Sequence, residues 1–158
     1  MEQHWQWVLP QSALLSVTAE EIEFLKKRSD ELFMGKTFSC GMTMLYCMSE
    51  LFKLPLDQQV LDALNGIMEH RDYRMQCGLY KGALMFLGIY GAAKGWDRPK
   101  LNEVTKDFAA KFEEAYGSQL CYDIRGGKFQ PTEPHDKCAP TTEKGVLLAA
   151  DFIKGLEA

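Results

Sequence analysis

Five cysteines are the residues of this chain whose chemistry is most informative: Cys40, Cys47, Cys77, Cys121 and Cys138. No two of them form a C-x-x-C pair. Zinc ribbons, ferredoxin-type iron–sulfur sites and thioredoxin-like redox sites all use such short pairs, so these local motifs are excluded. Any site that several of these thiols share must therefore be assembled by tertiary packing, with one cysteine from each structural element.

Four of the cysteines share a local setting, because each stands at or just before the start of a predicted helix. They are Cys40, Cys77, Cys121 and Cys138, whereas Cys47 falls inside a helix. The start of a helix carries unpaired N–H groups and about half a unit of positive charge, which favours a thiolate. Thiolates are the reactive and metal-binding form of cysteine. We therefore predict that these four converge in space and are the candidate catalytic residues, with Cys47 a spectator.

Three functions remain open for such a cluster. Two of the four thiols could form a reversible disulfide, as in a thiol-based oxidoreductase or electron-transfer protein. All four, Cys40, Cys77, Cys121 and Cys138, could instead hold an iron–sulfur cluster or zinc, since four thiolates suit both. In the third alternative the cysteines are small buried hydrophobic residues of a helical interaction module. The sequence identifies no substrate and no redox partner.

The element that must position these thiols is the stretch from 76 to 91, which contains Cys77 near its start. It is apolar on nearly every side, which predicts the buried central helix of the fold. Gly78 and Gly82 lie four residues apart on one face, where another backbone can approach closely. These two glycines are also the candidate cofactor-binding residues.

The rest of the chain shows helical periodicity and no two-residue alternation typical of strands. We predict an all-α, single-domain bundle of about six helices. The first begins at Thr18, where Glu21 completes a capping box, and ends at Gly35. The others are a helix from Thr37 or Ser39 to Leu54, one over 56–65 ending at Gly66, the central helix, one from Pro99 to Gly117, a short turn over 118–124 and a last helix from Ala139.

Residues 1–16 lack a helical period but carry Trp5 and Trp7. We interpret them as an arm, separate from the helical domain over 17–158, that packs on the body or across a homodimer. The net charge of −4 disfavours sequence-independent nucleic-acid binding. The longest apolar run has 12 residues, too short for a membrane span, and the N-terminus does not resemble a signal peptide. We therefore expect a cytoplasmic protein.

Basic, aromatic and imidazole side chains near the cysteines are secondary candidates. An arginine ahead of Cys77 would stabilise a thiolate by charge, and a histidine could replace a cysteine as a metal ligand. The ordinary interpretation is that most of them are solvated loop or helix-surface residues. The candidates are His70, Arg71, Arg74, Tyr80, Lys81 and His135.

The order of these features resembles a redox-active family named for its motif, C-GCAxxG-C-C. Cys40 resembles the early cysteine of that motif, and the segment from Gln76 to Gly82 resembles its Gly-Cys hexad, with Gln76 and Gly78 where the motif has Gly and Ala. Cys121 and Cys138 resemble the two later cysteines. The resemblance spans roughly residues 37–156 and implies a small redox-active protein, without naming a substrate.

Overall fold

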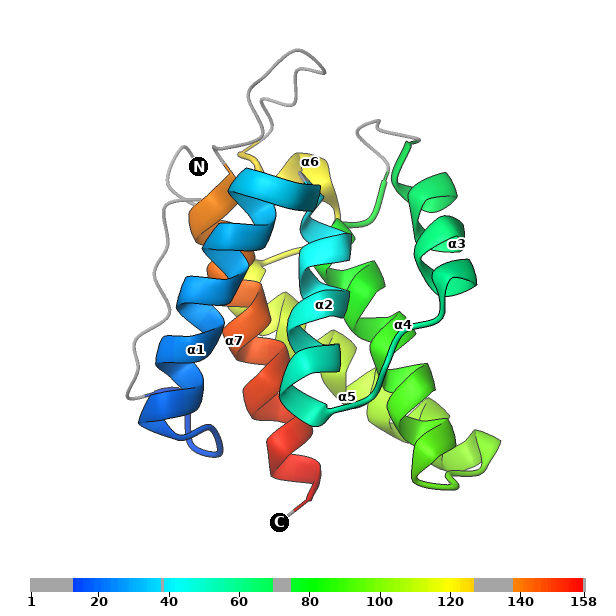
Figure 1. Ribbon diagram of the computed structural model, residues 1–158. Coiled ribbons are helices and arrows are strands. Elements are labelled where there is room, and N and C mark those ends of the chain that lie inside the picture. The colour runs from blue at the N-terminus through cyan, green and yellow to red at the C-terminus, as the bar shows by residue number, and fades with distance from the viewer. Residues whose placement is uncertain (1–12, 38, 70–74, 127–137, 158) are drawn as a thin grey trace.

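The computed structural model describes residues 13–37, 39–69, 75–126 and 138–157. Within these ranges the chain forms seven α-helices, one π-helical segment and no strand, so the prediction of an all-α fold is confirmed (Figure 1). The elements are α1 (Ala19–Glu31), the π-helix η3 (Leu32–Thr37), α2 (Cys40–Phe52), α3 (Gln58–Glu69), α4 (Gly78–Ala93), α5 (Arg98–Tyr116), α6 (Cys121–Ile124) and α7 (Ala139–Leu156).

The long helices run alternately up and down. In Figure 1, α2, α4 and α7 run downward, whereas α1, α3 and α5 run upward. Helix α4 packs against α2, α5 and α7. Its Phe86 is fully buried, as are Phe108 and Phe112 of α5. The predicted central helix is therefore present. It is not covered all round, since Met85 and Ile89 remain partly exposed on one side.

Helices α2 and α4 come close together because three glycines line their contact. A Cβ atom at Gly82 would lie 2.8 Å from the carbonyl oxygen of Gly41, and one at Gly41 would lie 3.2 Å from the carbonyl oxygen of Gly78. Both distances are shorter than ordinary van der Waals contact. The prediction that Gly78 and Gly82 allow another backbone to approach is confirmed, and the approaching backbone is that of α2.

Most predicted helix ends are found where the capping residues placed them. Thr18 and Glu21 form the capping box of α1, and the side chain of Ser39 accepts a hydrogen bond from the Met42 N–H at the start of α2. Pro99 lies in the first turn of α5. Gly117 ends α5 with a φ of 78°, a conformation that favours glycine.

Two predicted helix ends are wrong. After α1 the chain continues as η3 through Thr37, so Gly35 lies inside a helical segment. Likewise α3 continues past Gly66 to Glu69. Burial of Leu64 and Met68 on either side of Gly66 explains this extension. A glycine inside a helix costs only about 1 kcal/mol, less than two buried apolar side chains contribute.

The first described residues fix the start of α1 on α7. The backbone N–H groups of Ser16 and Val17 both donate to Asp151 Oδ1, at 2.6 and 3.1 Å, and Leu14 is buried in the core. Trp5 and Trp7 lie outside the described residues, so the roles of the arm and the domain boundary stay predictions. None of the described helices is long and apolar enough to cross a membrane.

Candidate functional site

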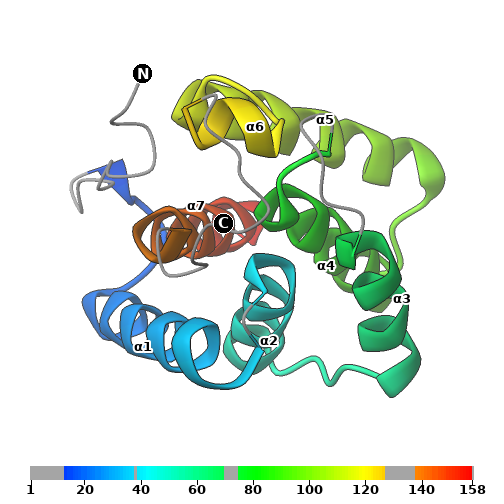
Figure 2. The same cartoon turned by 90° about the horizontal axis from the view of Figure 1, so that it is seen from above.

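Four helix starts gather at one end of the bundle, and each carries one cysteine. Cys40 is the first residue of α2, Cys77 the N-cap of α4, Cys121 the first residue of α6 and Cys138 the N-cap of α7. Figure 1 shows this end at the top, and Figure 2 looks down on it. The predicted placement of these cysteines at helix starts is therefore confirmed, and Cys47 lies within α2.

Cys40 and Cys77 form a directly interacting pair. The Cys77 thiol is hydrogen-bonded with Cys40, and Cys77 is only 5% exposed. The Cys40 sulfur also lies against Gly78, so closely that a methyl group at Gly78 would collide with it. The glycine contact between α2 and α4 therefore brings these two thiols together. The space beside Gly78 and Gly82 is filled by neighbouring protein atoms, and their role in binding a cofactor stays a prediction.

A short backbone pairing places Cys121 beside Cys77. The Cys77 N–H donates to the Gln119 carbonyl oxygen at 2.7 Å, and the Cys121 N–H donates to the Met75 carbonyl oxygen at 2.9 Å. These two bonds form an antiparallel bridge between Gln76 and Leu120. The segments that precede α4 and α6 are therefore held together as a two-stranded clip, and the starts of both helices follow from it.

Cys138 joins the cluster through an arginine. Nη1 of Arg125, the residue that follows α6, donates to the Cys138 sulfur at 3.2 Å. Cys121 interacts electrostatically with both Cys138 and Cys40. The four thiols thus form a series of pairwise interactions, of Cys77 with Cys40 and of Cys121 with Cys40, Cys77 and Cys138.

Arg125 is not among the candidate residues that the sequence predicts. One signal could have identified it. Arg125 follows Cys121 by four residues, and a single helical turn places such residues on the same face. The two arginines that the sequence did suggest, Arg71 and Arg74, lie outside the described residues, as do His70 and His135.

Hydrogen bonding, burial and mutual repulsion raise the pKa values of Cys77 and Cys121. The pKa of Cys77 is raised well above its ordinary value by the hydrogen bond with Cys40 and by burial. Burial, with added repulsion from Cys40 and Cys138, raises the pKa of Cys121 to about 12. The expectation that helix starts favour thiolates is therefore wrong for these two cysteines, because the hydrogen bond with Cys40 and burial hold the proton on Cys77, and burial holds the proton on Cys121.

Lys81 supplies a second positive charge to the site. It interacts electrostatically with Cys40, Cys77 and Cys121, and burial lowers its own pKa while the thiols oppose that shift. Its neighbour Tyr80 points elsewhere, since its ring stacks on Phe108 of α5 with centroids 6.1 Å apart. Of these two secondary candidates, the structure brings Lys81 to the thiols and places Tyr80 in the aromatic core.

Two hydrogen bonds join the end of α5 to α7. The Tyr116 hydroxyl donates to the Thr141 carbonyl oxygen at 2.8 Å, and Lys144 Nζ donates to the Ala115 carbonyl oxygen at 2.6 Å. Tyr116 is buried near enough to the cluster that Cys77 and Cys40 add to the burial that raises its pKa. These bonds fix the end of α5, from which the chain turns into the segment that carries Cys121.

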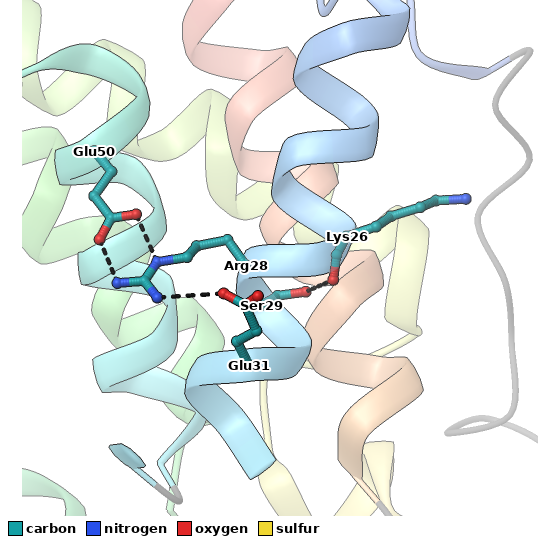
Figure 3. Close-up of polar contacts among 5 residues, drawn as sticks. All are labelled: Lys26, Arg28, Ser29, Glu31 and Glu50. Carbon is teal, nitrogen blue, oxygen red and sulfur yellow. Dashed lines mark hydrogen bonds and ion pairs between the residues drawn. The ribbon is translucent and has the colours of Figure 1, made fainter. Parts of the chain in front are cut away.

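Cys47 lies apart from this series. Its surroundings in the middle of α2 are core residues, and burial raises its pKa to about 12, with a smaller contribution from Glu50 and an opposing one from Arg28. Arg28 and Glu50 form a two-pronged ion pair on the surface between α1 and α2, with both nitrogen–oxygen distances 2.7 Å (Figure 3). No thiol of the cluster is among the groups that shift the pKa of Cys47.

One pair of thiols within the cluster interacts directly, that of Cys40 and Cys77. None of the five cysteines is in a disulfide. Among the described residues, which include all five, no three side chains of His, Cys, Asp or Glu are arranged to hold a metal ion. The hydrogen-bonded Cys40–Cys77 pair can exchange protons and form a bond.

An all-helical domain with thiols gathered at its helix starts defines a small cysteine-based helical protein. The family described as "Putative redox-active protein (C_GCAxxG_C_C)" matches residues 38–152, and the chain belongs to this family. That range includes all four cysteines of the cluster. In the same comparisons, no curated protein and no solved structure matches the chain.

Proposed function

We propose that this protein is a thiol redox protein in which Cys40 and Cys77 interconvert between a dithiol and a disulfide. The observation that supports this most directly is the hydrogen bond between the two thiols, formed where α2 and α4 meet at their glycines. Membership of a family described as redox-active agrees with this chemistry. The cytoplasm, where thiols are kept reduced, is the compartment that we propose.

The proposed reaction is thiol–disulfide exchange with a partner disulfide. One thiol loses its proton and its sulfur attacks the partner disulfide, forming a mixed disulfide and releasing one partner thiolate. The second thiol, after losing its proton, attacks the mixed disulfide and releases the other partner thiolate. Cys40 and Cys77 are then joined, and the partner has gained two electrons and two protons. Lys81 lies where it would stabilise a thiolate formed at Cys40 or Cys77.

Controlled oxidation followed by mapping of the thiols tests this proposal. Protein purified without oxygen would be equilibrated in mixtures of reduced and oxidised dithiothreitol, alkylated, and analysed by peptide mass spectrometry. We expect a disulfide between Cys40 and Cys77 with a defined midpoint, absent in Cys40→Ser and Cys77→Ser. Cys47→Ser is the matched control, because it removes a buried thiol of α2 that lies outside the cluster, and it should behave as wild type.

The same preparation distinguishes the main alternative. Brown protein that contains iron and sulfide in stoichiometric amounts, lost in Cys77→Ser but not in Cys47→Ser, would replace the disulfide proposal with an iron–sulfur site. Stoichiometric zinc with the same dependence would indicate a structural metal site. Colourless protein without metal and without any reversible disulfide would leave a helical interaction module as the function.

A further inference from the structure

We propose that the four thiols form a relay of two dithiols, in which Cys121 and Cys138 meet the substrate disulfide and Cys40 and Cys77 store the reducing electrons. This inference rests on the redox function proposed above, and it replaces direct attack by Cys40 or Cys77 on the partner disulfide with attack by Cys138. It assigns different tasks to four cysteines that the sequence treats alike.

We call Cys40 and Cys77 the inner pair and Cys121 and Cys138 the outer pair, because Cys77 is the buried member of the four, whereas Cys40, Cys121 and Cys138 are all partly buried. Cys77 is buried, and Cys40 lies against Gly78 within the contact of α2 and α4. Cys138 belongs to α7 and has the guanidinium of Arg125 as its partner, 3.2 Å from its sulfur. A positively charged donor at that distance stabilises a thiolate, the form that attacks a disulfide. Cys138 is therefore the thiol best suited to begin the exchange.

Cys121 is placed to connect the two pairs. The clip holds its backbone against Met75, two residues before Cys77. Its thiol interacts electrostatically with both Cys40 and Cys138. Arg125 follows it on the next helical turn, so the same short segment positions both Cys121 and the group that holds Cys138.

The relay needs no oxidant beyond the substrate disulfide. The Cys138 thiolate attacks a substrate sulfur, the substrate S–S bond breaks, and the departing thiolate takes up a proton. Cys121 gives up its proton and attacks the Cys138 sulfur. This step releases the second substrate thiolate and forms a Cys121–Cys138 disulfide. The substrate has then gained two electrons.

Two internal exchanges then restore the outer pair. Cys40 attacks the Cys121 sulfur and releases Cys138 as a thiolate, and Cys77 next attacks the Cys40 sulfur and releases Cys121. Each exchange breaks one S–S bond and forms another, and protons pass from the attacking thiol to the released one. The disulfide now joins Cys40 and Cys77, so the outer pair can reduce a second substrate disulfide. The fully reduced protein therefore delivers four electrons in two steps.

Rapid quenching during oxidation tests the order of these steps. Fully reduced protein would be mixed anaerobically with bis(2-hydroxyethyl) disulfide, quenched with acid at intervals, alkylated and mapped. We expect the Cys121–Cys138 disulfide to appear first and the Cys40–Cys77 disulfide to follow. Four of the five thiols should be lost at completion, with Cys47 retained.

Variants distinguish the cysteines that react with the substrate disulfide from the cysteines that store the reducing electrons. In Cys77→Ser the first disulfide should form at the wild-type rate, but the capacity should fall from four thiols to two. In Cys138→Ser the initial rate should fall about tenfold or more. Arg125→Met, which keeps every sulfur, should slow the first step and leave the capacity at four thiols. If circular dichroism shows that Cys138→Ser does not fold, Arg125→Met replaces it as the test of the first step. Cys47→Ser is the control.

The outcomes distinguish this inference from the function it rests on. A Cys40–Cys77 disulfide that forms first, at a rate unaffected by Cys138→Ser and Arg125→Met, would overturn the relay and leave the redox function standing. Loss of only two thiols in the wild-type protein would do the same. If no disulfide forms in wild-type protein, both proposals fail together.

Discussion

Helix α2 carries two cysteines in different surroundings, one at its start and one in its middle. Cys40 lies at the contact with α4 beside Cys77, whereas Cys47 is enclosed by core side chains near the Arg28–Glu50 ion pair. Cys47 and Cys77 are both buried and both have a raised pKa. Burial therefore does not separate the two regions. The difference is that the start of α2 has other thiols within reach, and the middle has none among the groups that affect Cys47.

The largest effect should come from filling the glycine contact between α2 and α4. Gly82→Val would drive a branched side chain into the Gly41 backbone, where even a Cβ atom would lie 2.8 Å from the carbonyl oxygen. We expect a loss of about 3 kcal/mol in the free energy of unfolding, measured in urea. Gly88→Ala on the same helix is the control, since no atom lies within 4 Å of its added Cβ, and it should be neutral or stabilising by up to about 1 kcal/mol. Equal losses in both variants would contradict the close contact.

A smaller change should disturb the thiol pair more than the fold. Gly78→Ala adds a methyl group that would collide with the Cys40 sulfur and lie 2.6 Å from Cε of Met68. Both neighbours are side chains that can shift, so we expect a loss of about 1–2 kcal/mol. The displaced Cys40 should slow formation of the Cys40–Cys77 disulfide, as followed by alkylation and mapping. An unchanged rate would show that the sulfur position at the start of α2 does not limit the reaction.

Cys47→Ala should change the dependence of stability on pH without affecting the cluster. An unfolded cysteine ionises near a pKa of about 8.5, whereas in the folded protein burial raises the pKa of Cys47 to about 12. The folded state thus holds this proton more tightly, and its contribution to stability is complete below the unfolded pKa and is lost as pH rises toward 12. Between pH 8 and 10 the variant should lose less stability than wild type, measured by urea unfolding.

Cys77 and Cys121 share this sign, since their pKa values are also raised, so the slope should decrease rather than vanish. The rate and capacity of disulfide formation should stay at wild-type values in Cys47→Ala. A change in either would place Cys47 inside the functional region and end the contrast between the two parts of α2.

The smallest effect should come from the ion pair outside Cys47. Arg28→Met removes both contacts to Glu50, but these side chains are about one-third exposed, at 30% and 34%. We expect a loss of about 0.5–1 kcal/mol that decreases in high salt. Lys26→Met is the control on the same helix, because the Lys26 side chain points away from the ion pair in Figure 3. A loss that salt does not reduce would indicate lost packing instead of lost charge.

Local chemistry in the sequence was sufficient to predict much of the framework. Thr18, Ser39 and Gly117 mark helix ends because their side chains, or the lack of one, satisfy terminal backbone groups wherever the helix lies. The same reasoning predicted the four cysteines at helix starts and a close approach of another backbone at Gly78 and Gly82. Such features depend on neighbours within a few residues, and those neighbours are visible in the sequence.

Only the tertiary structure decided how the thiols are paired and charged. The clip between the segments before α4 and α6 joins residues more than forty positions apart, as in the Cys77 to Gln119 bond, and no local pattern specifies such a contact. The contact of Arg125 with Cys138 also depends on tertiary packing, because it joins the residue after α6 to the N-cap of α7. Burial and interactions with neighbouring cysteines raise the pKa values of Cys77 and Cys121. A helix start attracts negative charge wherever it lies, but the packing around it determines whether water remains to support that charge.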